Sequence, residues 1–278
     1  MSELVGKRND QGGARLDVEL VRRGLARSRG QARELVVAGN VRVDGRVQQR
    51  ASLTVGADTV IALVSEPERW VGRAAYKLLE ALEAFGPRGL AVAGRRCLDV
   101  GAGTGGFTQV LLEAGAAHVT ALDVGHGQLV ASIAHDPRVE ERSGTNIRGT
   151  SPGGLGAAFD VVVADLSFIS LRLTLASMAA QLRPDGDLVT LVKPQFEVGR
   201  DRVGRTGVVT SWVEHARVLR DLARQAPSLG LRVLDLAPSP IRGADGNREY
   251  LLWMTPRPGE GLDLGVVEAL IEQVKGRP

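Results

Sequence analysis

From about residue 71 onward, the chain alternates two patterns of hydrophobic positions. Short, nearly continuous apolar runs such as FDVVVA (159–164) are typical of strands buried on both faces of a sheet. Between these runs lie stretches with apolar residues at helical spacing, the first of them apolar at Ala74, Leu78, Leu79, Leu82 and Phe85. This alternation predicts an α/β fold with a doubly wound, mostly parallel sheet.

The same pattern predicts three further helices that the structure can test. One begins at about Gly127, one lies within LTLASMAAQLRP (173–184), and a long one runs around residues 212–226. The segment DLVTLVKP (187–194) is expected to be a strand, as are RVLDLAPS (232–239) and YLLWMTP (250–256).

The first fifty residues show a different and smaller pattern. Apolar positions after Leu16 follow helical spacing until Gly24, and a second helix is expected from an N-cap at Ser28 to a stop at Gly39. The stretch VRVDGRV (41–47) then alternates around Asp44-Gly45, which is typical of a type I′ hairpin. Two short helices followed by a β-ribbon therefore predict a small α+β domain.

These patterns divide the 278 residues into four parts. We expect a polar leader at 1–14, the small α+β domain at 15–62, a linker at 63–70 around Pro67, and the large α/β domain at 71–278. A single core seldom grows much beyond about 250 residues, so one large domain with a small companion suits this length.

Composition indicates the cellular compartment of the protein and where its positive charge lies. Cys97 is the only cysteine, so no intramolecular disulfide and no cysteine-based zinc site is expected, and no metal is expected at all. The sequence shows no signal peptide and no apolar run of membrane length, which favours a cytoplasmic protein without stable membrane association. The formal net charge is only +3, but nine arginines against four acidic residues lie between Arg15 and Arg50, so the excess positive charge belongs to the first domain.

A glycine-rich turn joins an expected strand to a helix at CLDVGAGTGGFT (97–108). Such turns serve both dinucleotides and S-adenosylmethionine, because a ligand can approach backbone that has no Cβ. Asp123, at the end of the next expected strand, suits the ribose hydroxyls of either cofactor. S-adenosylmethionine is favoured over NAD because an extra helix precedes the domain's first strand, because Asp99 suits a methionine ammonium, and because ADLSF ends a later strand. The expected cofactor residues are Asp99, Gly101, Ala102, Gly103, Thr104, Gly105, Gly106, Phe107, Asp123, Asn146 and Asp165, with Asn146 equally well explained as part of a polar loop.

Two lysines and two acids are candidates for a catalytic site. Methyl transfer to a weakly acidic hydroxyl requires removal of its proton, and an amine held by carboxylates suits that task. Asp165 in ADLSF and Lys193 in LVKPQFE end expected strands, whereas Glu249 begins one. The fourth candidate, Lys77, lies in the helix before the sheet. Elements of a doubly wound sheet converge at its carboxyl edge, so we expect these four residues to meet there.

The run from Arg15 to Val47 resembles the S4-type RNA-binding domain. The resemblance rests on Arg15-Leu16-Asp17, Ala26-Arg27-Ser28-Arg29, Ala32, Gly39, Val41, Val43 and Asp44-Gly45. It implies RNA binding by this domain, and guanidinium groups near the start of the second helix suit phosphates. The expected RNA-binding residues are Arg15, Arg27, Arg29 and Arg33, and Arg200, Arg202 and Arg205 form either a second RNA clamp or an ordinary loop.

The order Lys, Asp, Lys, Glu resembles the tetrad of FtsJ-like 2′-O-methyltransferases. With the S4 domain in front, the chain resembles the TlyA family of ribosomal RNA cytidine 2′-O-methyltransferases, also labelled hemolysins, through WVGRAAYKL, LDVGAGTGGFT, ADLSFISL, LVKPQFEVGR and GNREYLLW. The resemblance implies a Rossmann-like class I methyltransferase domain, ribosomal RNA or ribosomal subunits as partners, and Lys193 as the base that Asp165 and Lys77 orient and Glu249 supports.

Three other functions stay open at this point. A membrane-active hemolysin would act without Asp165 and Lys193, a non-catalytic RNA-binding assembly factor would bind RNA without turnover, and an NAD-dependent oxidoreductase would bind NADH. The sequence predicts neither the modified nucleotide nor the oligomeric state. The sequence also departs from the family pattern, with Ala74-Ala75 in place of a second Gly-Gly and Arg205-Thr206-Gly207 after FEVGR.

Overall fold

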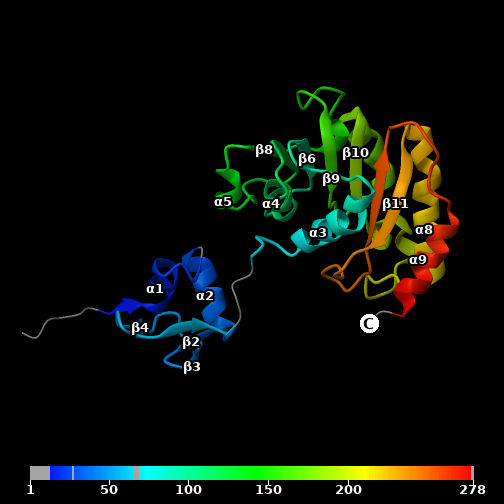
Figure 1. Cartoon of the computed structure of the whole chain (residues 1–278). Coiled ribbons are helices and arrows are strands. Elements are labelled where there is room, and N and C mark those ends of the chain that lie inside the picture. The colour runs from blue at the N-terminus through cyan, green and yellow to red at the C-terminus, as the bar shows by residue number, and fades with distance from the viewer. Residues whose placement is uncertain (1–12, 27, 65–68, 277–278) are drawn as a thin grey trace, which may run out of the picture. The chain divides into compact units, whose positions relative to one another are not determined.

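The computed structural model describes residues 13–26, 28–64 and 69–276, and the chain divides into two compact units, Met1–Arg69 and Trp70–Pro278 (Figure 1). The expected leader lies mostly outside the described residues, although Ala14 already pairs in a strand. Residues 65–68 of the expected linker also lie outside them. Trp70, expected in that linker, is 6% exposed and packs in the core of the second unit.

The described part of the N-terminal unit has two helices, α1 (Leu16–Arg22) and α2 (Arg29–Val37), packed with short strands around one core. Among its described residues, one sheet has the order β3-β2-β5 and a separate pair joins β1 to β4. Leu16, Leu20, Ala32 and Val36 are fully buried in its core. The strands are β1 (Ala14–Arg15), β2 (Val41–Val43), β3 (Arg46–Gln48), β4 (Thr54–Val55) and β5 (Ile61–Leu63).

Two local features of this unit were correctly predicted from sequence. The Ser28 hydroxyl accepts a hydrogen bond from the backbone amide of Gln31 at 3.2 Å, so Ser28 caps α2. Asp44 and Gly45 have φ of 48° and 80°, the left-handed pair that a type I′ turn requires, and they join β2 to β3. The Asp44 carboxylate also accepts a hydrogen bond from the amide of Val60 and ties the turn to the start of β5.

In the described part of the second unit, seven strands form one sheet with the order β11-β12-β10-β9-β6-β7-β8. Neighbouring strands from β10 through β8 are parallel, and β12 is antiparallel to both of its neighbours, so the sheet is mostly parallel, as expected. Its strands are β6 (Arg96–Val100), β7 (His118–Asp123), β8 (Val139–Ser143), β9 (Phe159–Ala164), β10 (Leu182–Val192), β11 (Arg232–Pro238) and β12 (Tyr250–Thr255).

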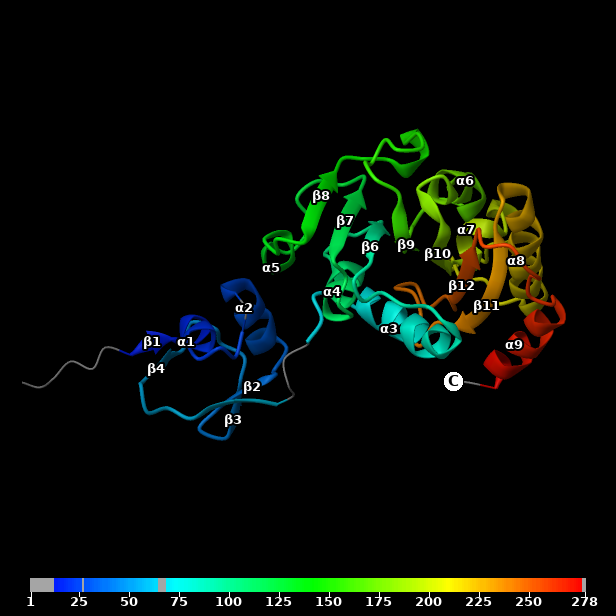
Figure 2. The same cartoon turned by 45° about the horizontal axis from the view of Figure 1, so that its top comes forward.

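Helices cover both faces of this sheet (Figures 1 and 2). One face packs against α3 (Ala74–Phe85) and α4 (Gly106–Glu113), where Phe85 stacks on Trp253 with ring centroids 5.5 Å apart. The other face packs against α6 (Leu175–Ala179), α8 (Trp212–Gln225) and α9 (Gly265–Lys275). Burial on both faces explains why strands such as β9 are apolar along nearly their whole length.

Two predicted helices are short. The helix expected from about Gly127 is α5, which spans Ala131–Ala134 and leaves out Gly127, whose left-handed φ of 62° a helix cannot contain. The helix expected within 173–184 is α6, which lies inside that segment and ends at Ala179, before β10 begins at Leu182. The long helix α8 lies where predicted.

Strand order determines where a ligand site can form. The neighbours of β6 on its two sides are β9 and β7, so the direction of the chain connections reverses at β6. Ligands of doubly wound sheets bind at such a point, outside the carboxyl ends of the strands. The glycine-rich turn follows β6, Asp123 ends β7 and Asp165 follows β9, so these segments meet at one edge.

Candidate active site

The turn after β6 requires glycine for a physical reason. Gly101 has φ of +86°, and a Cβ at this position would lie 2.8 Å from the backbone oxygen of Asp165. At Gly105, φ is +98° and a Cβ would lie 2.8 Å from Leu129 Cδ1. An L-residue with a side chain is strained by such φ values, and here it would also collide with its neighbours. Glycine at position 101 therefore allows the backbone of the turn to pack directly against the backbone that follows β9.

Asp123, at the end of β7, lies next to the glycine-rich turn. Its Oδ2 accepts a hydrogen bond from the Gly103 amide at 2.8 Å, and its Oδ1 accepts one from the Gly125 amide at 2.8 Å. These bonds orient the carboxylate beside the glycine turn, and each oxygen keeps a further lone pair for a ligand.

A pocket of about 490 Å³ opens between these segments. Of the expected cofactor residues, it is lined by Gly101, Gly103, Asp123, Asn146 and Asp165. Asp99, Ala102, Thr104, Gly105, Gly106 and Phe107 do not line it. Sequence analysis missed several lining residues, among them Gln128 and Thr174, for which no motif gave a signal; Ser167 and Phe168 lay within the ADLSF motif without being assigned to the pocket.

Asp99 is fully buried behind this pocket. Thr108 donates its hydroxyl hydrogen to Asp99 Oδ2 at 2.7 Å, whereas Oδ1 has no hydrogen-bond partner among the described residues. Burial raises the pKa of Asp99 to about 7, although the Thr108 hydrogen bond opposes the shift. A carboxyl group at this position is therefore partly neutral near physiological pH.

The structure brings the four catalytic candidates together at the carboxyl edge of the sheet. Lys77 Nζ, from α3, lies 3.1 Å from Asp165 Oδ2 and 2.7 Å from Glu249 Oε2. Lys193 Nζ, directly after β10, lies 2.6 Å from Asp165 Oδ1. Asp165 thus contacts one lysine with each of its oxygens. The four side chains are 2–11% exposed.

The charges in this cluster stabilise one another. Burial alone would lower the pKa of Lys77, but the negative charges of Asp165 and Glu249 outweigh burial and raise it. Burial likewise opposes ionisation of Asp165, yet the charges of Lys193 and Lys77 lower its pKa. Lys77 and Asp165 therefore remain charged at neutral pH.

Lys193 has a different environment from Lys77. It contacts one carboxylate instead of two, and its Nζ also donates a hydrogen bond to the Ser167 hydroxyl at 2.9 Å. Among the described residues, Lys193 therefore makes one ion pair and Lys77 makes two. Ser167 was not singled out from the sequence, although it lies within the ADLSF motif.

Three of the arginines expected to bind RNA meet at one buried acid. Arg15, Arg29 and Arg33 contact the Asp17 carboxylate at 2.9, 3.4 and 3.2 Å, and the Asp17 side chain is fully buried. The Arg15 hydrogen bond, with those of the other two arginines, holds the pKa of Asp17 well below its usual value despite burial. The three arginine side chains remain 45–59% exposed, and Arg27 lies outside the described residues.

The arginines of the second expected clamp are not equivalent. Arg202 pairs with Glu214 of α8 at 3.3 Å. Arg205 is exposed and, with Phe168 and Phe196, lines a hollow of about 520 Å³. The side chain of Arg200 is outside the described part of the structure.

Comparison with known proteins places both units in families. Residues 70–255 match the FtsJ-like methyltransferase family and residues 14–61 match the S4 domain. The chain therefore belongs to the FtsJ-like methyltransferases and carries an S4 domain at its N-terminal side. Within them it belongs to the TlyA family, on the evidence of the relatives that follow.

Relatives are similar along nearly the whole chain. The 16S/23S rRNA (cytidine-2′-O)-methyltransferase TlyA of Mycobacterium tuberculosis (strain ATCC 25618 / H37Rv) is 49% identical over 261 residues, covering 94% of this chain and 96% of that protein. Hemolysin A of Brachyspira hyodysenteriae is 35% identical and covers 85% and 98%. A solved structure from Streptococcus thermophilus that also bears the name hemolysin is 35% identical, with a TM-score of 0.72 and coverage of 95% and 96%.

The family settles the choice between cofactors. The methyl donor is S-adenosylmethionine and not NAD. The pocket fits this molecule, because Gly101 and Gly103 leave backbone exposed to it and Asp123 offers carboxylate oxygens for ribose hydroxyls. No helix among the described residues is long and apolar enough to cross a membrane.

Proposed function

We propose that this protein methylates the 2′-hydroxyl of cytidine in ribosomal RNA, with Lys193 as the base. The observation that carries the proposal is the contact of Lys193 Nζ with Asp165 Oδ1 at 2.6 Å, because Asp165 also lines the cofactor pocket. The amine therefore contacts a residue that lines the cofactor pocket. The name of the 49% identical relative supports the substrate and the reaction.

The reaction needs a base because a ribose hydroxyl is a weak acid. S-adenosylmethionine supplies an electrophilic methyl group when bound. In our proposal, Lys193 enters the step as a neutral amine and takes the proton from the 2′-hydroxyl. The hydroxyl oxygen would then displace sulfur at the methyl carbon, so that the carbon–oxygen bond forms as the carbon–sulfur bond breaks and S-adenosylhomocysteine leaves. Asp165, which lines the pocket, holds Nζ in place, and the resulting ammonium regains its full ion pair with that carboxylate.

Lys77 and Glu249 have a supporting role in this proposal. Lys77 keeps its proton, because two carboxylates raise its pKa. Its ammonium contacts Asp165 Oδ2 and so holds this carboxylate with Oδ1 on Lys193. Glu249 in turn fixes the position of Lys77.

The other expected residues are assigned as follows. We infer that Asp99, Gly101, Ala102, Gly103, Thr104, Gly105, Gly106, Phe107, Asp123, Asn146 and Asp165 form and support the cofactor site, either at its lining or directly behind it. The N-terminal unit binds folded ribosomal RNA through the exposed arginines around Asp17, and the protein acts in the cytoplasm on ribosomal subunits.

Substitution of the base tests the proposal. Purified protein is incubated with labelled S-adenosylmethionine and ribosomal subunits that lack this methylation, and the product nucleosides are identified by mass spectrometry. Lys193→Ala is expected to lower the rate at least about 100-fold, and Lys193→Arg should not restore it because an arginine does not give up its proton. Lys275→Ala, at the exposed end of α9, is the control and should match the wild type. Equal rates for wild type and Lys193→Ala would refute Lys193 as the base.

A further inference from the structure

Ser167 contacts Lys193 and also lines the cofactor pocket. It follows Asp165 by two residues, and its hydroxyl oxygen accepts a hydrogen bond from Lys193 Nζ at 2.9 Å. Ser167 is exposed, whereas the Lys193 side chain is 9% exposed. Among the described residues, Asp165 and Ser167 are the two that line the pocket and also form a polar contact with this amine.

The two polar contacts of Lys193 Nζ differ in kind. The contact with Asp165 Oδ1 at 2.6 Å is a charge–charge contact, and Oδ1 has no hydrogen-bond partner among the described residues. Within the same part of the chain, the hydrogen bond of this amine is the one to Ser167. A Coulomb attraction depends on distance, whereas a hydrogen bond also requires its hydrogen to point at the acceptor. Ser167 therefore sets the direction of one N–H of Lys193.

This difference matters once Lys193 has lost a proton. In the proposed reaction Lys193 acts as a neutral amine, and a neutral amine no longer forms an ion pair with Asp165. Its remaining N–H groups still donate, so the hydrogen bond to Ser167 continues to hold Nζ in place. A neutral amine has two hydrogens and one lone pair, and a hydrogen held by Ser167 restricts where the lone pair can point. A base must direct this lone pair at the proton that it takes.

The loop that carries Ser167 is held in one conformation. Phe168, the next residue, has a left-handed φ of 64°. Such a backbone conformation is unfavourable for a bulky residue and persists only where surrounding contacts enforce it. Phe168 is 91% exposed, so burial of its own ring contributes little to holding this conformation. Contacts further along the loop must contribute instead.

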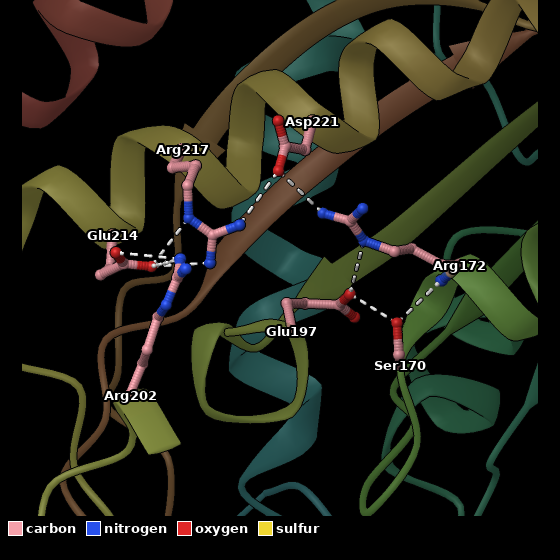
Figure 3. A network of polar contacts seen from close by, with 7 residues as sticks. All are labelled: Ser170, Arg172, Glu197, Arg202, Glu214, Arg217 and Asp221. Carbon is pink, nitrogen blue, oxygen red and sulfur yellow. Dashed lines mark hydrogen bonds and ion pairs between the residues drawn. The ribbon is translucent and has the colours of Figure 1, made fainter. Parts of the chain in front are cut away.

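A buried carboxylate supplies such contacts (Figure 3). Glu197, with a side chain 1% exposed, accepts hydrogen bonds from the Ser170 hydroxyl and the Leu171 amide, each at 2.6 Å. It is the last residue of α7 (Pro194–Glu197), the short helix that directly follows Lys193. One carboxylate thus ties this loop to the segment that begins with the proposed base.

We propose that Ser167 is a positioning residue for methyl transfer, whose hydroxyl holds Lys193 Nζ in place while the amine is neutral. This inference rests on the proposed function, because it takes Lys193 to be the base. Ser167 itself neither forms nor breaks a covalent bond in the reaction. Its effect therefore lies in the rate of the chemical step and passes through Lys193.

A double-mutant cycle tests this role. The rate of methyl transfer to ribosomal subunits that lack the methylation is measured for wild type, Ser167→Ala, Lys193→Ala and the double variant. Calorimetry measures the Kd of S-adenosylmethionine for each protein, and thermal unfolding gives each Tm. Ser228→Ala is the matched control, because Ser228 is also exposed and makes a hydrogen bond, to the Gln225 backbone oxygen, but does not line the pocket.

The expected results separate positioning of the base from cofactor binding and from folding. Ser167→Ala should lower kcat about tenfold, with the KM for subunits and the Kd of S-adenosylmethionine within about twofold of wild type. Its Tm should not fall, because Ser167 is exposed. In the Lys193→Ala background the same substitution should change the rate by less than about twofold, since the amine that Ser167 holds is gone. Ser228→Ala should match the wild type.

Three results would overturn the assignment. An unchanged kcat in Ser167→Ala, with Lys193→Ala slow, overturns it and leaves the proposed function standing. A tenfold loss in both backgrounds does the same, because Ser167 would then act on the cofactor or the RNA and not through Lys193. A wild type that methylates no ribosomal RNA, or a Lys193→Ala variant as fast as wild type, overturns both proposals.

Discussion

Lys77 Nζ lies 2.7 Å from Glu249 Oε2, although the two residues come from opposite ends of the second unit's chain. The direction of β12 explains this contact. Because β12 is antiparallel to β10, with Tyr250 opposite Val192, its first residue lies at the edge where β10 ends. Glu249, directly before β12, therefore lies beside Lys193 and Asp165. A parallel last strand would have placed it at the far edge of the sheet.

Removing Glu249 should destabilise the protein. Its side chain is 2% exposed, and Glu249→Ala leaves the Lys77 ammonium buried with one carboxylate in place of two. Breaking a buried ion pair costs about 3–5 kcal/mol. Because Lys77 still pairs with Asp165 in this variant, we expect the lower end, a loss of about 3 kcal/mol in the free energy of unfolding measured with urea. Glu272→Ala, on the exposed side of α9, is the control and should change the free energy of unfolding little. Equal stabilities of the two variants would contradict the network.

The pH dependence of the free energy of unfolding should show the raised pKa of Asp99. Its folded pKa of about 7 exceeds the usual value of about 3.9, so the folded state keeps a proton that the unfolded state loses as pH rises. The protonated Asp99 therefore contributes fully to the free energy of unfolding below about pH 4, and this contribution is lost as the pH rises to about 7. Asp99→Asn cannot lose this proton, so its stability relative to wild type should increase by about 1.4 kcal/mol per pH unit between pH 5 and 7 and then level off. A difference that is flat over this range in denaturant unfolding would contradict burial of a protonated Asp99.

Asp17 should support RNA binding although it is an acid. Asp17→Ala makes the N-terminal unit more positive but releases Arg15, Arg29 and Arg33 from their shared partner. We expect RNA affinity to fall about fivefold, because three long side chains must then be ordered on binding. Fluorescence anisotropy with ribosomal RNA at fixed salt measures the change, and Asp58→Ala, also in this unit but with an exposed side chain, is the charge-matched control. Tighter binding by Asp17→Ala would show that net charge alone governs affinity.

Gly101→Ala should affect both folding and cofactor binding. The variant combines a left-handed φ of +86° with a Cβ 2.8 Å from the Asp165 backbone oxygen. We expect a loss of about 1–3 kcal/mol in stability and at least tenfold weaker binding of S-adenosylmethionine by calorimetry. Gly94→Ala separates the two causes, because Gly94 has a similar φ of +72° but a Cβ added there would meet nothing within 4 Å. Similar binding losses in both variants would show that backbone strain, and not the contact with Asp165, is responsible.

Local features were predictable from the sequence because they depend on neighbouring residues. The cap at Ser28, the turn at Asp44-Gly45 and the strand-turn-helix around Gly101 each need only a few residues of particular conformational preference. The apolar run of β9 was enough to indicate a strand buried on both faces. The helix predicted from about Gly127 begins only at Ala131, because a turn at Gly127 precedes it, and the helix predicted within 173–184 stops before the start of β10 at Leu182.

By itself, the sequence determined the class of fold, the glycine turn and the residue types available for chemistry. Only the tertiary structure decided that Lys77 and Lys193 share the two oxygens of Asp165 and that three arginines share Asp17. These contacts join residues far apart in the chain. They depend on strand order, strand direction and the approach of loops, which the packing of the whole sheet and its helices sets and no short segment encodes.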